Sequence, residues 1–228
     1  MVRYKNYGEN DNHNFDVGGG QDNQLCLSYV FTYRQRVYLV FKRCCDFVIA
    51  LIALIVLQIP FLIIAVIQKI TMPKEPVFFK QTRIGKCMKP FTLVKFRSMK
   101  SSAPHDCATK DFSNGEQYIT TFGRFLRNTS IDELPQLFQV LTGKMSLIGP
   151  RPLIPQEKVL HKKRAEAGIY SVCPGMTGLA QVNGRDFVND TEKFKFDKIY
   201  VEKIGLKMDL KILWTTIKKV VTRADIQI

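Results

Sequence analysis

Two adjacent acidic residues, Asp132 and Glu133, lie in a chain that offers few other side chains for acid–base or nucleophilic chemistry. Arg127 precedes the pair, and Arg151 follows it between two prolines. Proline restricts the backbone on either side of Arg151, which suits a planar guanidinium that must donate two parallel hydrogen bonds to a phosphate. Carboxylates bind Mg²⁺ and arginines stabilise charge on phosphate oxygens, so this combination indicates phosphoryl-transfer chemistry.

Three more basic residues extend the candidate phosphate-binding set, namely Lys95, Arg97 and Arg185. The simpler alternative is that an Asp-Glu pair at the start of a helix only interacts favourably with the helix dipole. No Gly-x-Ser-x-Gly, His-Glu-x-x-His, P-loop or Gly-x-Gly-x-x-Gly motif occurs in the sequence. The six cysteines and three histidines form no cluster with metal-ligand spacing, so we expect reduced thiols and no structural zinc.

The acid pair is predicted to lie at the N-terminus of a helix. Ser130 and Glu133 have the spacing of a capping box, and apolar residues then recur at helical spacing until Gly143. Pro135 fits only in the first turn, so the helix begins at either Ser130 or Asp132.

Short β-branched and aromatic segments predict strands over 76–80 and 91–96, with a basic turn over 83–86. Residues 101–118 are polar and contain proline and glycine, which predicts a loop. The part of the chain beyond residue 71 is therefore expected to be a mixed α/β domain.

Residues 47–67 form the longest apolar run, interrupted only by Gln58 and Pro60. At about 1.5 Å per residue, the run is long enough to cross a hydrocarbon core of about 30 Å. Pro60 removes a backbone donor inside the run, which predicts a kink, and the Gln58 amide lies in the same turn. These two residues are the candidate break of a membrane helix.

Basic residues flank this run on both sides, and basic flanks prefer the cytoplasmic side of a membrane. A spanning helix would place one basic flank on the opposite face, whereas a bent, re-entrant helix keeps both flanks on the cytoplasmic side. We therefore favour a re-entrant helix, with a proline-containing span as the alternative.

Residues 206–223 place apolar residues and Trp214 at helical spacing, with lysines between them. This pattern predicts a basic amphipathic helix of the kind that lies on a membrane surface. A core helix with a solvated basic face is the alternative, and the apolar run elsewhere in the chain favours the membrane.

Positive charge is the strongest compositional anomaly of this chain of 228 residues, which has 34 basic and 20 acidic residues and a net charge of +14. Residues 1–40 contain four basic and four acidic residues, so the excess lies in 41–228. Such an excess indicates a polyanionic partner, which could be nucleic acid, an anionic membrane or a phosphorylated substrate. The start of the chain is rich in Asn, Asp and Gly, which predicts a partly disordered tail over 1–40.

Five segments in one order, together with the apolar run, carry a resemblance that covers residues 41–228. This order closely resembles the bacterial sugar transferase family, the small monotopic phosphoglycosyl transferases. The segments are Lys-Phe-Arg-Ser-Met (95–99), Ser-Ile-Asp-Glu-Leu-Pro-Gln (130–136), Ser-Leu-Ile-Gly-Pro-Arg-Pro (146–152), Pro-Gly-Met-Thr-Gly (174–178) and Gln-Val-Asn-Gly-Arg (181–185).

The resemblance implies an enzyme that transfers a sugar-1-phosphate from a UDP-sugar to a polyprenyl phosphate, such as undecaprenyl phosphate, and releases UMP. This reaction would start the assembly of a surface glycan or exopolysaccharide. The resemblance also implies that Asp132 is the nucleophile of a covalent aspartyl-phosphosugar intermediate. Glu133 would assist, and the two acids would hold Mg²⁺. The candidate substrate-binding residues remain Lys95, Arg97, Arg127, Arg151 and Arg185.

The implied protein is monotopic, with a re-entrant membrane helix over 41–70 and a cytosolic catalytic domain with amphipathic surface helices over 71–228. The domain would lie on the cytoplasmic face of the bacterial plasma (inner) membrane. The family usually has Ser-Pro at the helix break, whereas this chain has Ile59-Pro60, so Gln58 is the candidate to replace the missing hydroxyl.

The expected partners are a UDP-sugar, polyprenyl phosphate and membrane lipid, without nucleic acid, and no oligomeric state is predicted. A basic nucleic-acid-binding module on a membrane anchor and a non-catalytic membrane scaffold are the alternatives. The nucleic-acid module leaves both the acid pair and the Pro-Arg-Pro segment unexplained.

Overall fold

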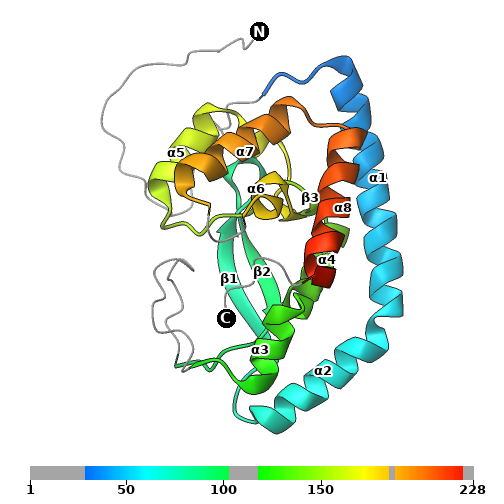
Figure 1. The fold of residues 1–228 in the computed structure, drawn as a ribbon, viewed down its shortest axis with the longest axis vertical. Helices are drawn as coiled ribbons and strands as arrows, with labels where there is room; N and C mark the ends of the chain where they lie inside the picture. The colour runs from blue at the N-terminus through cyan, green and yellow to red at the C-terminus, as the bar shows by residue number, and fades with distance from the viewer. Residues whose placement is uncertain (1–28, 103–117, 185–187, 223–228) are drawn as a thin grey trace.

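The computed structural model describes residues 29–102, 118–184 and 188–222, and within them helices lie around two small sheets (Figure 1). This confirms the predicted mixture of helices and strands in a small domain. The elements in chain order are α1 (Tyr33–Val56), α2 (Gln58–Thr71), β1 (Phe78–Ile84), β2 (Pro90–Phe96), α3 (Thr121–Asn128), α4 (Leu137–Leu141), β3 (Ser146–Ile148), α5 (Lys158–Glu166), β4 (Gly175–Thr177), α6 (Leu179–Val182), α7 (Asp190–Glu202) and α8 (Leu206–Thr222).

The first helix begins earlier than the predicted membrane segment. The Thr32 side chain accepts a hydrogen bond from the backbone N–H of Gln35, whose own side chain accepts one from the N–H of Thr32. This capping box starts α1 at Tyr33 and not at residue 41. The end of the segment predicted as a tail is therefore helical, and residues 1–28 lie outside the described part of the chain.

The two N-terminal helices meet at Leu57 with a bend of 59°, which confirms the predicted kink. Pro60 is the third residue of α2, so its missing N–H falls in the first turn, where no intrahelical acceptor exists. Gln58 opens α2 and its side chain is exposed. Within the described residues, no single helix is long and apolar enough to cross a membrane, whereas the bent pair together meets that requirement of length and composition.

β1 and β2 form an antiparallel hairpin whose register pairs Phe78 with Phe96. Both strands were expected, but the first continues through Ile84, into the segment predicted as a basic turn. The chain reverses in a short 3-10 turn at Lys86–Met88, where Cys87 has a left-handed backbone with φ +53°. The hairpin is therefore longer than its β-branched residues suggest.

The capping box predicted before the acid pair is wrong. A capping residue has an extended backbone, whereas Ser130 is left-handed with φ +56° and its side chain does not cap the helix. Residues Ile131–Gln136 form a 3-10 helix that leads directly into α4. Asp132 and Glu133 still lie in the first turn of this segment, as predicted.

Two clusters of buried apolar side chains form the core. One joins Ala50 of α1 with Leu93 of β2 and Val140 of α4. The other includes Ile148 of β3 and Ile212 of α8. Both the long N-terminal helix and the C-terminal helix therefore pack against the domain that carries the acid pair.

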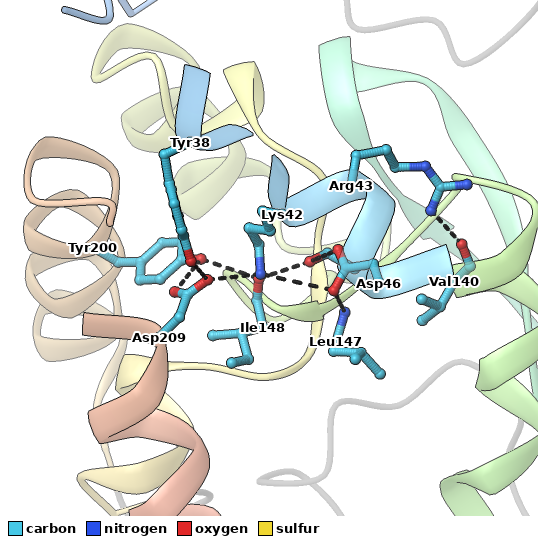
Figure 2. A network of polar contacts seen from close by, with 10 residues as sticks. Tyr38, Lys42, Arg43, Asp46, Val140, Leu147, Ile148, Tyr200 and Asp209 are labelled. Carbon is cyan, nitrogen blue, oxygen red and sulfur yellow. Dashed lines mark hydrogen bonds and ion pairs between the residues drawn. The ribbon is translucent and has the colours of Figure 1, made fainter. Parts of the chain in front are cut away.

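A buried polar network joins α1 to α8 and β3 (Figure 2). Lys42 Nζ lies 2.8 Å from Asp209 Oδ2 and 3.9 Å from Asp46 Oδ1. Asp209 also accepts a hydrogen bond from the Tyr38 hydroxyl at 2.6 Å, and the Tyr200 hydroxyl lies 3.0 Å from its other oxygen. Asp46 accepts two hydrogen bonds from β3. The network fixes the first half of α1 on the domain.

α8 is the predicted amphipathic helix, but its apolar stripe faces away from the core. The buried residues of α8 are Asp209 and Ile212. Asp209 is buried because it accepts the hydrogen bond of Tyr38 and the ion pair of Lys42 in the polar network, and Ile212 packs in the core. The alternative of a core helix with only a basic face in solvent is therefore wrong. The exposed apolar residues of α8 are Leu206, Leu210, Leu213, Trp214, Ile217, Val220 and Val221.

Candidate active site

Glu133 lies in a recess between the β1–β2 hairpin and the Pro-Arg-Pro segment. Lys95 Nζ lies 2.6 Å from Glu133 Oε1, and Arg151 Nη1 lies 4.0 Å from the same oxygen. One carboxylate oxygen therefore faces two cations from different parts of the chain. The residues that line the recess are Arg83, Leu93, Lys95, Glu133, Gln136, Arg151, Pro152, Gly175, Met176 and Gln181.

Asp132 precedes Glu133 in the same 3-10 turn and is largely buried, with 8% of its surface exposed. The turn is held against β2, since the Lys95 side chain of that strand reaches Glu133. The structure thus brings two of the predicted cations, Lys95 and Arg151, to Glu133, whereas Asp132 precedes it in the chain and is not among the residues that line the recess.

Arg83 is a recess residue that sequence reasoning missed. Its Nη1 donates to the Pro152 carbonyl at 3.1 Å and its Nη2 to the Gln81 side chain at 2.7 Å. Its Nε is buried without a hydrogen-bond partner among the described residues. Burial and the nearby Arg151 lower the pKa of Arg83 to about 10. Among the residues that line the recess, three cations face one carboxylate, so an anionic ligand would be stabilised there.

Close packing of two glycines determines where Arg151 lies. The Gly149 N–H donates to the Thr177 carbonyl at 2.8 Å, and the Gly175 N–H donates to the Pro150 carbonyl at 2.9 Å. A Cβ on Gly175 would lie 2.1 Å from the backbone nitrogen of Gly149, which is too close for any side chain. The Pro-Gly-Met-Thr-Gly segment thus brings β4 against the Pro-Arg-Pro segment and presents Arg151 to the recess.

Arg97 and Arg127, two of the other predicted phosphate-binding residues, do not line the recess. Arg97, the residue after β2, is buried, and its guanidinium donates from Nε to the Pro76 carbonyl at 3.0 Å and from Nη1 to the Ser101 hydroxyl at 3.1 Å. Arg127 Nη1 lies 3.3 Å from the sulfur of Met99. Arg185 falls outside the described residues. Phosphate contacts of these three arginines stay predictions.

The two acids by themselves supply too few ligands for Mg²⁺, and a bound substrate would have to supply others. Across the described residues, no group of three or more His, Cys, Asp or Glu side chains could hold a metal ion. Mg²⁺ commonly takes one or two carboxylates and completes its coordination with phosphate oxygens and water. Asp132 and Glu133 fit this pattern when the ligand supplies phosphate groups.

Comparison with known sequences identifies a family and several relatives of this chain. A family model described as bacterial sugar transferase matches residues 37–223. A Bacillus subtilis (strain 168) protein named uncharacterized sugar transferase EpsL is 39% identical, over 82% of this chain and 85% of that protein. The exopolysaccharide production protein ExoY of Sinorhizobium fredii (strain NBRC 101917 / NGR234) is 35% identical, over 78% of this chain and 84% of that protein.

A third relative is much longer than the segment that aligns with this chain. The UDP-glucose:undecaprenyl-phosphate glucose-1-phosphate transferase of Escherichia coli (strain K12) is 37% identical over 78% of this chain, which spans only 39% of that protein. The family match includes the bent helix pair, the acid pair and all the residues that line the recess. The chain therefore belongs to the bacterial sugar transferase family.

Proposed function

We propose that this protein transfers a sugar-1-phosphate from a UDP-sugar to undecaprenyl phosphate or a similar polyprenyl phosphate and releases UMP. The observation that carries the proposal is the recess, which Arg83, Lys95 and Arg151 line together with Glu133, the residue after Asp132, and in which Lys95 and Arg151 lie within 4.0 Å of the Glu133 carboxylate. A diphosphate supplies the negative charge that this arrangement lacks. Similar proteins named as UDP-glucose:undecaprenyl-phosphate transferases support the choice of substrates.

The Asp132 carboxylate acts as the nucleophile in this proposal. A carboxylate oxygen forms a bond to the sugar-linked phosphorus of the UDP-sugar, and the bond from that phosphorus to the bridging oxygen breaks. The electron pair leaves on UMP, whose charge the recess cations stabilise. An oxygen of the polyprenyl phosphate then attacks the same phosphorus, forms the diphosphate product and releases the Asp132 carboxylate.

Mg²⁺ is the proposed cofactor, held by Asp132 and Glu133 together with substrate phosphate oxygens. When bound, it would neutralise charge on the phosphates. EDTA is expected to stop UMP release and added Mg²⁺ to restore it. Undiminished turnover in metal-free buffer would refute the metal role.

Apolar side chains on three helices support attachment to a membrane. They form exposed surfaces on α1, α2 and α8, with basic residues beside those on α8. The most exposed aliphatic side chains on α1 and α2 are those of Val40, Ile52, Ile55, Val56, Ile59, Leu62 and Ile70.

Both ends of the bent helix pair are held on one domain, which supports a re-entrant segment with the catalytic domain on the cytoplasmic face. In α1, Lys42 pairs with Asp209, and in α2 the buried Gln68 side chain donates to the backbone carbonyl of Arg97. A helix pair whose two ends contact the same domain enters and leaves a bilayer on one side.

A UMP-release assay with a panel of UDP-sugars and undecaprenyl phosphate tests the proposed reaction. Asp132→Asn is expected to abolish release, because an amide oxygen is a far weaker nucleophile than a carboxylate. Glu166→Gln removes an exposed acid on α5 and serves as the matched control. Substantial turnover by Asp132→Asn would remove Asp132 as the nucleophile.

The topology is tested separately with single cysteines at Arg36 and Lys74 in a cysteine-free background. Both positions are exposed, whereas the flanking Lys42 is buried and unsuitable for labelling. A re-entrant segment predicts labelling from the same face of the membrane. Labelling from opposite faces would establish a span.

A further inference from the structure

A buried ion pair joins α5 to α7 behind the recess. The Arg164 side chain donates from Nη2 to Oδ2 of Asp197, and the two residues are only 2% and 1% exposed. The other arm of the guanidinium, Nη1, donates to the backbone carbonyl of Arg151 at 2.8 Å. The pair therefore contacts the backbone of Arg151, whose side chain lines the recess.

The Pro-Arg-Pro segment is held mainly by its carbonyl groups. Pro150 and Pro152 lack N–H groups, so the backbone has few donors with which to bind its surroundings. The Pro150 carbonyl accepts from Gly175 at 2.9 Å, and the Pro152 carbonyl accepts from Arg83 at 3.1 Å. Arg164 fixes the carbonyl between them, which belongs to Arg151 itself.

Stability alone does not account for an ion pair at this depth. Replacing a buried ion pair by apolar side chains of similar volume is often neutral or stabilising, because the ions lose their hydration. Arg164 instead fixes the position of the Arg151 carbonyl. Its guanidinium is planar and rigid, so an arm fixed by Asp197 determines where the other arm points.

We propose that Arg164 and Asp197 are a pair of positioning residues that fix the backbone of Arg151 and thereby hold its guanidinium in the recess beside Glu133. The pair acts through Arg151 and does not itself touch the substrate. The inference rests on the proposed function only in that the ligand of the recess is a phosphorylated anion.

The test uses the 228-residue chain and two variants of it. In Arg164→Met/Asp197→Leu the pair is replaced by apolar side chains, while in Arg164→Lys the charge opposite Asp197 is kept and the rigid fork is lost. Lys163→Met, at an exposed neighbouring position, is the control. Binding of UDP and of inorganic pyrophosphate is measured by calorimetry, and thermal unfolding is measured in parallel.

Both variants are expected to weaken binding of UDP and pyrophosphate on the order of tenfold, the effect of losing one well-placed charge-assisted hydrogen bond. The double variant is expected to unfold within about 5 °C of the wild type, because its buried charges are removed together. The control should bind both anions as the wild type does.

A double-mutant cycle separates positioning from general damage. If the pair acts through Arg151, neither variant weakens binding further once Arg151 is replaced by Met. Additive losses would overturn the proposal, as would unchanged affinity in a folded Arg164→Lys variant, or a wild type that binds neither anion. Anion binding that depends on the pair in a protein without UMP release would refute the proposed function and leave this inference standing.

Discussion

Replacing Lys42 by Met tests whether the buried network of Figure 2 holds the first helix on the domain. The Lys42 ammonium contacts Asp46 of its own helix and Asp209 of α8, whose side chains are 6% and 7% exposed. Within the described residues, no other cation lies within 4.0 Å of these two carboxylates. The substitution would therefore leave two buried carboxylates without a cation, at the point where α1 joins α8.

The expected loss follows from this arrangement. Removing one partner of a buried ion pair typically lowers the free energy of unfolding by about 3–5 kcal/mol. For a chain of this size, each kcal/mol shifts the unfolding temperature by about 2–4 °C, so Lys42→Met should unfold roughly 6–20 °C below the wild type. Adding Asp209→Asn should recover part of the loss, because one uncompensated charge disappears while one of the two oxygens that accept from Tyr38 and Tyr200 remains.

Thermal unfolding of purified protein in one fixed detergent or nanodisc preparation measures these shifts. Lys162→Met, an exposed lysine on α5, is the control and should unfold with the wild type. A shift below about 3 °C at neutral pH would show that the network does not stabilise the attachment of α1 to the domain.

Three further predictions concern two residues of the recess and one of α5. Arg83→Met should raise the KM for a UDP-sugar on the order of ten- to a hundredfold, measured by UMP release, because a charged donor is lost from the recess. Gly175→Ala should lower the free energy of unfolding by about 3 kcal/mol or more, measured by denaturant titration, because the added Cβ meets backbone atoms that cannot move aside. Burial, and secondarily the charge of Arg164, lowers the pKa of His161. The stability that neutral His161 contributes is therefore present above its unfolded pKa of about 6.5 and is lost as the pH falls below that value. Between pH 7.5 and 5.5, the unfolding temperature of His161→Gln should therefore fall less than that of the wild type.

The controls for these predictions are close neighbours. Lys80→Met removes an exposed cation from the same strand as Arg83 and should leave the KM unchanged. Gly205→Ala should change the free energy of unfolding little, because the nearest atom to its added Cβ lies at 3.9 Å. Equal effects of Arg83→Met and Lys80→Met would mean that net charge, and not the recess, governs substrate binding.

Residue type and spacing were enough to predict several features because these depend on local chemistry. An apolar run of this length with a proline inside it predicts a bent helix, and the bend lies at Leu57. The acid pair lies in the first turn of a short helix as its spacing predicts. The colinear motifs were enough to identify the family, which the match over residues 37–223 confirms.

Features that depend on distant partners could not be predicted in this way. α8 buries Asp209 rather than its leucines, because the partners of that carboxylate, Tyr38 and Lys42, lie in a helix far away in the sequence. The side-chain period of two along β1 could have placed Arg83 on the same face as Gln81, but only the position of the Pro-Arg-Pro segment brings that face into the recess.

The sequence by itself therefore determined the kind of chemistry, the family and the bent apolar helix, since each follows from residue types at short separation. The tertiary structure decided which cations line the recess with Glu133, which face of α8 is exposed and what holds Arg151 in place. Arg83 and Arg164 both donate to backbone carbonyls of the Pro-Arg-Pro segment, which the close approach of Gly149 to Gly175 holds against β4. Contacts of this kind depend on how separate segments pack, which no local pattern of residues encodes.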